Sequence, residues 1–489
     1  EDETEKLISM MAENGFDRSR CLELILSLYP NDNERLIESV SFVCDRLYPD
    51  LMGISGEIDS IIDALSGSFI LPGPSGAPTR GRAQILPTGR NFYSIDPETV
   101  PWQSSWEVGK GLAEQMLERY VSEHGTHPRN VAMVVWATDT MKTGGEDISY
   151  ILWLMGLHPI WSGYGGRVEG LAVVPLSELG RPRVDVTVRI SGLFRDTFPN
   201  IVNLLDRGVA MIAELDESDE DNALRANLRD DVVRAIERGI PEDRAREEAK
   251  VRIFGDAPGT YGSGTSTLIS TSRWGDLSDL GGIYLSCGSY AYGVGRRGEY
   301  LPSAFSRRLS ITDVTVKNSI SREYDMLDND DVYNDLGGMN AAIRSLKGES
   351  PMSVIGCSED TTDLRTRTIG EEARFIFRSK IQNPKWVNGL REHGFNGAQE
   401  ISNLTEYVFA WDATSGIVDP WMYQTIADRF LLDGVNSEWM RDVNPYAMHE
   451  TVSWLLEAVG RGMWSPDDET RERLEALYLD LEGDLEGTE

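Results

Sequence analysis

The continuous apolar run VAMVVWAT at residues 131–138 restricts the possible folds more than any other segment of the chain. It is rich in β-branched residues, which is typical of a strand buried on both sides of a parallel sheet. An amphipathic helical pattern at 106–124 precedes it, and a Gly turn followed by a helical pattern at 143–157 comes after it. A second strand pattern, RVDVTVRI at 183–190, alternates strictly, so one of its faces is polar. Helices that alternate with strands predict an α/β fold.

The pattern changes along the 489 residues and divides the chain into five segments. Residues 1–65 have helical periodicity and form a helical N-terminal segment. Residues 66–100 form a connection whose density of Pro and Gly excludes helices and central strands. The rest is predicted to be an α/β domain at 101–300, a mixed α/β segment with an acidic loop at 301–382, and a helical C-terminal region at 383–489. We therefore expect a multi-domain α/β protein with parallel or mixed sheets and a helical C-terminal region.

Net charge excludes one class of partner. Eighty Asp and Glu residues against 47 Lys and Arg residues give −33, whereas nucleic-acid binding requires a basic surface. No apolar run reaches the ~20 residues of a membrane-spanning helix. The first residues, EDETEKLISM, resemble neither a signal peptide nor a basic presequence. We expect a cytoplasmic protein that binds neither nucleic acid nor a membrane.

The scarcity of Lys relative to Arg also indicates the kind of organism from which the protein comes. Only eight of the basic residues are Lys. An acidic, Lys-poor composition suits a cytoplasm of molar salt, where the Debye length falls to about 3 Å and self-repulsion is screened. We therefore hypothesise a halophilic source, with an ordinary acidic protein as the alternative.

Cysteine spacing predicts neither a metal site nor a disulfide framework. The four Cys residues, at 21, 44, 287 and 357, include no CxxC pair and match no zinc or iron–sulfur pattern. We expect four reduced and mostly buried thiols.

The segment EYDMLDNDDVYND at 323–335 is the strongest candidate for chemistry. Crowded carboxylates raise one another's pKa values, so one of them is suited to act as a base near neutral pH. Oxygen donors also capture a hydrated divalent cation without clamping it. An exposed acidic loop is the alternative interpretation. The carboxylates are Glu323, Asp325, Asp328, Asp330, Asp331 and Asp335, with Tyr324 and Tyr333 between them.

Histidine and arginine supply further candidates. His393, in REHGFNGAQE, precedes a predicted helix, where capping or packing is the alternative to a catalytic role. Arg195 comes at the end of a predicted strand, where α/β proteins build their sites, and a guanidinium binds a carboxylate bidentately. Arg80, Arg82 and Arg90 have the same capacity, and an internal ion pair is the alternative for each Arg.

Two Gly-containing segments are expected to be structural. Glu146 and Asp147 follow a Gly pair that opens a predicted helix, where carboxylates commonly accept hydrogen bonds from free backbone N–H groups.

The string GSGTST at 262–267 is the nearest to a GxxxxGK[ST] phosphate loop, but it lacks the Lys that contacts the β- and γ-phosphates. We therefore expect that this chain does not itself bind ATP.

Strings of residues across the chain resemble, in the same order, the large subunits of the CobN and magnesium-chelatase family. They are GPSGAPTRGRAQILPTGRNFYSIDP (73–97), WATDTMKTGGEDI (136–148), ELGRPRVDVTVRISGLFRD (178–196), FGDAPGTYGSG (254–264), EYDMLDNDDVYNDLGGM (323–339), NPKWVNGLREHGFNGAQE (383–400), WDATSGIVD (411–419) and NPYAMHETVSWLLEAVGRGMW (444–464). The family subunit is usually more than twice as long, so the resemblance implies its later half. The missing initiator Met also indicates a fragment or a processed chain.

The resemblance implies an enzyme that inserts a divalent metal into a tetrapyrrole. The large subunit binds the macrocycle, while an AAA+ subunit of the CobS or ChlI type, with its integrin-domain partner of the CobT or ChlD type, uses Mg-ATP. The strings PTGRNFYSIDP, TGGEDI and DNDDVY favour CobN, and so a cobaltochelatase that inserts Co²⁺ into a cobalamin precursor of the hydrogenobyrinic acid a,c-diamide type. A magnesium-chelatase H-like subunit and a truncated, non-catalytic tetrapyrrole or metal carrier are the alternatives.

The resemblance also assigns residues. In the magnesium enzymes, functional His and Asp residues match this chain near Asp331 and Asp335, whereas cobaltochelatases usually have His at Tyr324. The resulting prediction comprises three groups: Asp328, Asp330, Asp331, Asp335 and His393 for catalysis; Arg195, Tyr324 and Tyr333 for the macrocycle; and Glu323, Asp325 and His393 for the metal ion.

Overall fold

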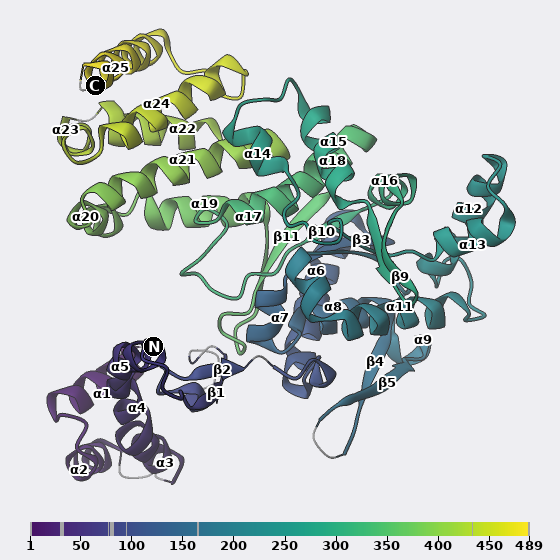
Figure 1. Ribbon diagram of the computed structural model, residues 1–489, viewed down its shortest axis with the longest axis horizontal. Coiled ribbons are helices and arrows are strands. Elements are labelled where there is room, and N and C mark those ends of the chain that lie inside the picture. The colour runs from purple at the N-terminus through teal and green to yellow at the C-terminus, as the bar shows by residue number, and fades with distance from the viewer. Residues whose placement is uncertain are drawn as a thin grey trace. The chain divides into compact units, whose positions relative to one another are not determined.

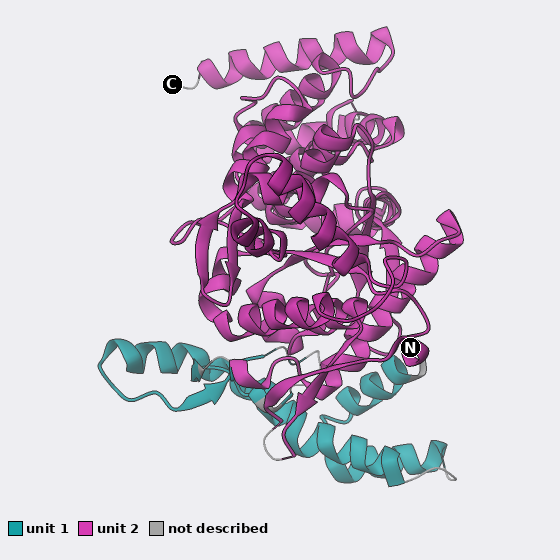
Figure 2. Ribbon diagram, turned by 90° about the vertical axis from the view of Figure 1, so that its right-hand side faces the viewer, with its two compact units in different colours: residues 1–96 teal, residues 97–489 magenta. Residues whose placement is uncertain are grey.

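The computed structural model describes residues 2–29, 34–76, 78, 83–93, 95–163, 166–432 and 434–487. The chain separates into two compact units, Glu1–Asp96 and Pro97–Glu489 (Figure 2). We describe each unit by itself. The finer five-part division of the chain stays a prediction.

Unit 1 is a small helical bundle followed by a short strand pair. Its first three helices and a π-helical turn, η1 (Val43–Leu47), pack around a core of Met11, Cys21, Ile25, Val40 and Cys44. The helices are α1 (Asp2–Glu13), α2 (Arg18–Leu28), α3 (Glu34–Phe42), α4 (Tyr48–Met52) and α5 (Gly56–Leu65), and the strands β1 (Pro72–Pro74) and β2 (Asn91–Tyr93) pair in parallel. The helices predicted for residues 1–65 are therefore present.

Unit 2 is built on an eight-stranded sheet in the order β12-β11-β10-β3-β6-β7-β8-β9. The central five strands, from β11 to β7, are parallel, and the outer strands are antiparallel to their neighbours. The bounds are β3 (Asn130–Val135), β6 (Asp185–Ile190), β7 (Ile253–Gly255), β8 (Tyr290–Gly293), β9 (Arg296–Tyr300), β10 (Val314–Val316), β11 (Met352–Cys357) and β12 (Arg365–Thr368). The buried strand predicted at 131–138 is β3, at the centre of the sheet, but it ends at Val135, and residues 137–138 already belong to the following helix.

The strand order reverses between β3 and β10. From β3 the chain adds β6 and β7 on one side, and then returns to add β10 and β11 on the other side. Open α/β sheets bind their ligands outside the carboxyl ends of the strands at such a reversal, because the connections there diverge to opposite faces. The topology therefore indicates where a ligand site would lie.

Helices cover both faces of this sheet (Figure 1). One face carries α6 (Gln103–His124), α8 (Glu146–Met155) and α11 (Pro199–Ala213), and the other carries α15 (Leu277–Gly288), α16 (Pro302–Ser310) and α18 (Gly338–Lys347). Apolar side chains of β3 and β7 pack against α15, α16 and α18 in a core that includes Ala132, Phe254, Phe305 and Ile343. The predicted α/β class is confirmed.

Shorter elements connect these layers. The helices are α7 (Ala137–Thr143), α9 (Leu176–Leu179), α10 (Gly192–Thr197), α12 (Ala223–Glu237), α13 (Glu242–Ala249), α14 (Thr265–Ser270) and α17 (Asp330–Val332), and a π-helical turn, η6 (Tyr333–Gly337), joins α17 to α18. The strands β4 (Leu157–Trp161) and β5 (Val168–Val173) form a separate antiparallel hairpin.

The polar face predicted for 183–190 is buried. All six residues of β6 are inaccessible to solvent, because the helices cover both sides of the sheet. Asp185 forms ion pairs with Arg252 at 2.6 Å and Arg308 at 2.9 Å, and Arg189 pairs with Asp256. A buried charge is tolerated when it is paired and hydrogen-bonded in this way. The polar face of β6 thus carries internal ion pairs.

The helical C-terminal region is also confirmed. Its elements are α19 (Ile369–Lys380), α20 (Pro384–Glu392), α21 (Phe395–Ser415), α22 (Pro420–Ile426), α23 (Gly434–Val443), α24 (Pro445–Gly460) and α25 (Asp468–Glu486). The long helix α21 runs through this region, and its fully buried Trp411 donates an indole hydrogen bond to the Met326 carbonyl at 2.9 Å. This bond anchors the acidic segment 323–335 to the helical region.

The cysteines and the helices agree with two further expectations. All four cysteines are free, and three of them are buried. Across the part of the chain that the structure describes, no helix is both long and apolar enough to cross a membrane.

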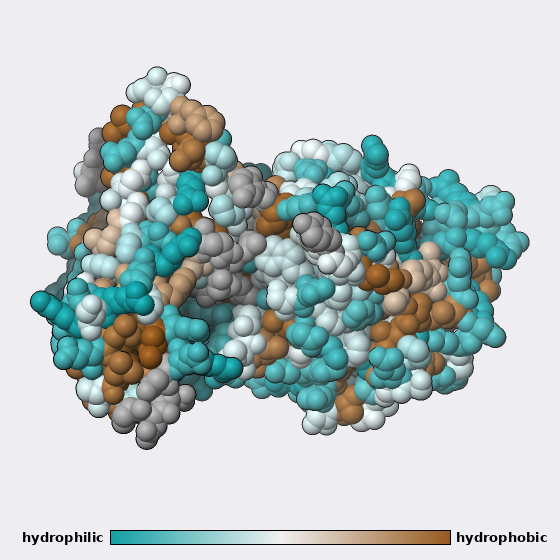
Figure 3. All heavy atoms as spheres, turned by 90° about the horizontal axis from the view of Figure 1, so that it is seen from below, coloured by the Kyte–Doolittle hydropathy of each residue, from teal (hydrophilic) through white to brown (hydrophobic). Residues whose placement is uncertain are grey.

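The net charge of −33 predicts a stability that depends on salt. Hydrophilic residues cover most of the face seen in Figure 3. Because the Debye length shrinks from about 10 Å at 0.1 M salt to about 3 Å at 1 M, repulsion among surface carboxylates is screened. We expect the melting temperature to rise between low salt and molar KCl, as measured by calorimetry. Sorbitol at equal osmolality is the control, and an unchanged melting temperature in KCl would remove the halophile hypothesis.

Candidate functional site

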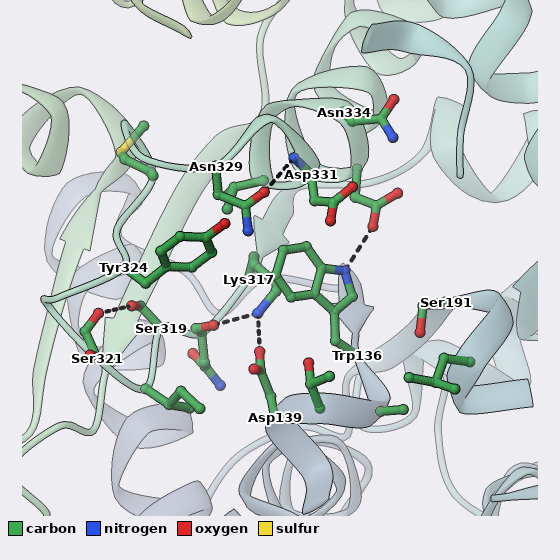
Figure 4. A pocket seen from close by; sticks show the side chains of 18 of the residues that line it. Trp136, Asp139, Ser191, Lys317, Ser319, Ser321, Tyr324, Asn329, Asp331 and Asn334 are labelled. Carbon is green, nitrogen blue, oxygen red and sulfur yellow. Dashed lines mark hydrogen bonds and ion pairs between the residues drawn. The ribbon is translucent and has the colours of Figure 1, made fainter. Parts of the chain in front are cut away.

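A cavity lies at the carboxyl ends of the parallel strands, where the strand order reverses. The segment 136–139 follows β3, 191–193 follows β6 and 317–321 follows β10, and Asp256 follows β7. These residues line a cavity of about 460 Å³, shown in Figure 4. This volume falls within the ~300–1,000 Å³ that is usual for small-molecule sites.

The acidic segment 323–335 forms another wall of the same cavity. Its contribution consists of Tyr324, Asp325, Met326, Asn329, Asp331, Val332, Asn334 and Asp335. Carboxylates therefore outnumber cations around the cavity: the former are Asp139, Asp256, Asp325, Asp331, Asp335 and Glu372, and the latter are Lys142 and Lys317. A cavity with this balance attracts cations.

Asp335 is a base candidate inside the cavity. Its Oδ2 accepts a hydrogen bond from the Trp136 indole N–H at 2.7 Å (Figure 4). Burial raises the pKa of Asp335 to about 6, with Asp256 and Asp331 adding to the rise and Arg189 opposing it. A carboxylate with this pKa accepts a proton near neutral pH.

Close packing fixes the π-helical turn that carries Asp335. The Asn334 side-chain oxygen accepts hydrogen bonds from the Ser266 backbone N–H at 2.9 Å and the Ser263 hydroxyl at 2.7 Å. At Gly337, a Cβ atom would come within 2.6 Å of the Thr414 hydroxyl oxygen, so the absence of a side chain allows α21 to approach. The turn is thereby held from α14 and from α21.

Asp331 is the second acidic residue of the segment that is open to the cavity. Its side chain is exposed, and the Asn329 side chain accepts a hydrogen bond from its backbone N–H at 2.8 Å. Although the residue is exposed, the protein around its carboxyl group removes part of the hydration and raises the pKa of Asp331, and the neighbouring Asp330 adds to the rise. Asp330 is exposed and does not line the cavity.

Asp325 and Asp328 are joined by one lysine. The Lys380 ammonium of α19 lies 2.8 Å from Asp325 and also pairs with Asp328. Asp325 additionally accepts a hydrogen bond from the Leu327 backbone N–H at 2.8 Å, and burial raises the pKa of Asp325 to about 6. This pair therefore fixes the acidic segment to α19, and Asp325 alone of the two lines the cavity.

Four further residues of the prediction differ in whether they line the cavity. Tyr324 lines the cavity with 64% of its surface exposed, and Glu323 beside it is exposed. Tyr333 is fully buried and donates a hydrogen bond to Glu406 at 3.3 Å. His393 is exposed at the C-terminal end of α20, outside the set of lining residues.

Arg195 holds a loop rather than facing the cavity. Its guanidinium binds Asp196 bidentately at 2.7 and 2.8 Å and donates to the Ala257 carbonyl at 2.7 Å. These bonds tie α10 to the segment after β7. Arg80 and Arg82 lie outside the described residues, and Arg90 is exposed in unit 1.

Glu146 and Asp147, at the start of α8, bind the ends of two strands. Asp147 accepts a hydrogen bond from the Asn318 amide at 2.8 Å, just beyond β10. Glu146 accepts one from the Ser358 hydroxyl at 2.5 Å, just beyond β11. Both carboxylates are buried, and burial raises the pKa of Asp147 to about 7. Instead of the expected hydrogen bonds from backbone N–H groups, the Asp147 carboxylate accepts one from the side chain of Asn318, which lines the cavity.

Sequence reasoning missed three residues of the cavity. The Lys317 ammonium donates to Asp139 Oδ2 at 2.5 Å and to the Asn318 carbonyl at 2.6 Å, and it lies 4.2 Å from the centre of the Trp136 ring. Trp136 and Asp139 come after the observed end of β3 at Val135, whereas the strand was predicted to continue to residue 138. The rule that parallel strands build sites at their carboxyl ends would have pointed to both.

Within the described ranges, no group of three or more His, Cys, Asp or Glu residues is arranged to hold a metal ion. The cavity combines aromatic rings, of which Trp136 is part-buried and Tyr324 exposed, with carboxylates of raised pKa and an excess of negative charge. Such a combination suits transient contact with a cation and the acceptance of protons.

The sheet and its cavity define a doubly wound α/β protein with an acidic, ligand-sized site at the strand reversal. The family model described as CobN/Magnesium Chelatase matches residues 1–471. The chain belongs to this family, and the resemblance seen in the sequence is confirmed.

Several relatives and one solved structure can be compared with this chain. It is 43% identical to an uncharacterized protein of Methanocaldococcus jannaschii, covering 98% of this chain and 38% of that protein. It is 42% identical to the aerobic cobaltochelatase subunit CobN of Pseudomonas aeruginosa, covering 90% and 35%. A magnesium-chelatase subunit of Chlorobaculum parvum is 33% identical, covering 96% and 37%.

The solved catalytic subunit of cobaltochelatase from Mycobacterium tuberculosis superposes with a TM-score of 0.92 at 40% identity, over 99% of this chain and 40% of that one. This chain thus spans between 35% and 40% of the length of these four proteins.

Proposed function

We propose that this chain forms the metal-inserting part of the large subunit of an ATP-dependent cobaltochelatase. It would bind a cobalamin-precursor tetrapyrrole of the hydrogenobyrinic acid a,c-diamide type and insert Co²⁺ as a substrate ion. An AAA+ subunit and its integrin-domain partner would hydrolyse Mg-ATP. The observation that carries the proposal is the acidic cavity at the strand reversal, with Asp335 and Asp331 both of raised pKa.

Metal insertion breaks the inner N–H bonds of the macrocycle, one in a corrin and two in a porphyrin, and forms metal–nitrogen bonds. At least one proton must therefore be accepted for each ion inserted. Asp335 inside the cavity and Asp331 at its side are suited to this task, because a base works best when its pKa lies near the working pH. Trp136 and Tyr324 offer aromatic surfaces to a flat ring.

The ion must also lose its hydration shell without being trapped. Carboxylate oxygens bind divalent ions, and a cavity with more carboxylates than lysines concentrates them. Glu323, exposed next to Tyr324, stays a proposed contact for the arriving ion. Cobalt is favoured because two compared proteins, the Pseudomonas and Mycobacterium subunits, are cobaltochelatase subunits.

The other predicted residues keep more indirect roles in this proposal. Asp325 and Asp328 would hold the acidic segment in place through Lys380, and Arg195 would hold the loop after β7. Tyr333, Asp330 and His393 do not line the cavity, and roles for them stay predictions. A cytoplasmic location and a halophilic source are likewise proposals from composition.

Two alternatives have support of their own. Magnesium-chelatase subunits of several organisms are 33–35% identical to this chain, which keeps a magnesium-inserting subunit as a second candidate. Tyr324, at a position where cobaltochelatases usually have His, keeps a carrier of tetrapyrrole or metal as a third candidate.

A reconstituted assay tests the proposal. The chain is mixed with its AAA+ and integrin-domain partners, ATP, either a metal-free corrin precursor or a metal-free porphyrin, and either Co²⁺ or Mg²⁺. Insertion is followed by absorption spectroscopy. The proposal predicts a cobalt-containing product that depends on ATP. Magnesium insertion into a porphyrin instead would favour the second candidate, and macrocycle binding without insertion would favour the carrier.

A further inference from the structure

A chain of polar contacts runs across the cavity floor from β10 to the acidic segment. Lys317, the first residue after β10, is held by Asp139 of α7 at 2.5 Å. Its ammonium lies 4.2 Å from the centre of the Trp136 ring. The indole N–H of Trp136, the first residue after β3, donates to Asp335 at 2.7 Å. Figure 4 labels Lys317, Asp139 and Trp136 and marks the ion pair between Lys317 and Asp139 with a dashed line.

The two oxygens of Asp335 have different surroundings. Oδ2 accepts the Trp136 hydrogen bond, whereas Oδ1 receives no hydrogen bond from any residue that the structure describes. Side chains of four other elements or segments also face this carboxylate: Arg189 of β6, Asp256 after β7, Tyr284 of α15 and Asp331 of α17. The Arg189 guanidinium is already paired with Asp256. The neutral indole is therefore the group that fixes the orientation of Asp335.

A neutral hydrogen-bond donor is better suited than a cation to orient a carboxylate that acts as a base. A cation bonded directly to a carboxylate would favour its charged form strongly and weaken it as a base. An indole N–H orients the carboxylate while favouring the charged form less, because it carries no net charge. The cation of this network, Lys317, lies against the face of the indole ring, where it fixes the ring by a cation–π contact.

We propose that Trp136 is a positioning residue for Asp335, and that Lys317 and Asp139 hold the Trp136 ring in place. Trp136 keeps one carboxylate oxygen bonded and so presents the other to the macrocycle. The inference deepens the proposed function and rests on it for the role of Asp335, whereas the contact itself can be tested without any metal or macrocycle.

The variant Trp136→Phe tests the pairing through the pH dependence of metal insertion. Phe keeps an aromatic ring over Lys317 and removes the N–H donor. Losing that donor disfavours ionised Asp335, so the acid limb of the rate profile should move to higher pH by about one unit. Above both pKa values the rate should approach that of the original chain. An acid limb that stays in place would overturn the proposal.

Trp421→Phe is the matched control. The Trp421 indole also donates to a carboxylate, Asp419 at 3.1 Å, but in the helical C-terminal region and away from the cavity. This variant loses the same kind of bond and should leave the pH profile unchanged. An equal shift in both variants would show a general effect on folding and would overturn the proposal.

Tryptophan fluorescence provides a test that needs no enzymatic activity. A protonated carboxyl group next to an indole alters its emission, so the original chain should show a transition near pH 6 that belongs to Asp335. The transition should vanish in Trp136→Phe and in Asp335→Asn and persist in Trp421→Phe. Its persistence in Trp136→Phe would overturn the pairing. Its presence in a chain that inserts no metal would instead count against the proposed function alone.

The supporting role of the lysine is tested by removing both partners of its ion pair. Lys317→Met combined with Asp139→Asn removes both charges of the ion pair together, so folding should be kept. With the ring no longer held, the fluorescence transition should broaden and insertion at neutral pH should slow at least fivefold. An unchanged rate and transition would show that Trp136 needs no support from Lys317.

Discussion

Replacing Asp335 with Asn should lower the rate of metal insertion by about 10²–10⁴-fold, the usual contribution of a positioned acid–base group. Asn keeps the shape of the side chain and can still accept the Trp136 hydrogen bond, but it cannot take up a proton. Binding of the metal-free macrocycle should change little, because the cavity keeps its walls. The rate is measured in the reconstituted assay, and binding by absorption titration.

Asp412→Asn is the control for this prediction. Burial raises the pKa of Asp412 to about 6 as well, and the residue accepts a hydrogen bond from the Tyr423 hydroxyl at 3.0 Å within the helical region. It does not line the cavity, so insertion should stay within about twofold of the original rate. If both variants lost activity equally, or if Asp335→Asn kept full activity, the assignment of Asp335 would be wrong.

Replacing Asp185 with Asn should have the largest effect on stability, a loss of about 3–5 kcal/mol. Asp185 is buried at the start of β6 and is the shared partner of Arg252 at 2.6 Å and Arg308 at 2.9 Å. A neutral amide would leave the buried Arg252 guanidinium without its counter-charge, and it would leave Arg308 with Asp231 as its remaining partner. Denaturant unfolding of the original chain and the variant at pH 7 measures the loss.

The pH dependence of this effect follows from the pKa of Asp185. Burial alone would raise that pKa, but Arg252 and Arg308 outweigh it and lower it. The ion pairs therefore stabilise the fold fully above the unfolded-state pKa of about 3.9, and this stability is lost as the pH falls through the lower folded-state value. The gap between the original chain and Asp185→Asn should narrow in that acidic range.

An exposed ion pair gives the comparison for Asp185. Glu242 and Arg246 pair at 2.6 Å on the surface of α13, and Glu242→Gln should cost less than about 1 kcal/mol. A loss below about 1 kcal/mol for Asp185→Asn as well would contradict the view that the polar face of β6 is held by its buried ion pairs.

The alternation of 183–190 shows what sequence can and cannot predict about this fold. It correctly indicates a strand with one polar face. It cannot show that the face is buried, because the charges that neutralise Asp185 come from Arg252 and Arg308, which lie 67 and 123 residues further along the chain. The strand within the apolar run at 131–138 was easier to predict, because its apolar residues indicate burial on both sides without reference to any distant residue.

The candidate site, like the strand at 183–190, could be predicted from the sequence only in part. The density of carboxylates at 323–335 predicted the segment that lines the cavity, but not which members face it. Lys380, which is 52 residues away from Asp328, binds both Asp328 and Asp325, and only Asp325 of these two lines the cavity. Lys317 was missed because β10 is only three residues long, too short to show a periodic pattern.

A crystal structure of this chain with a metal-free corrin precursor tests the central claim most directly. The account predicts the macrocycle in the cavity at the ends of β3 and β10, against Trp136 and Tyr324, with its inner nitrogens towards Asp335. A macrocycle bound elsewhere on the chain, with this cavity left open to solvent, would contradict it.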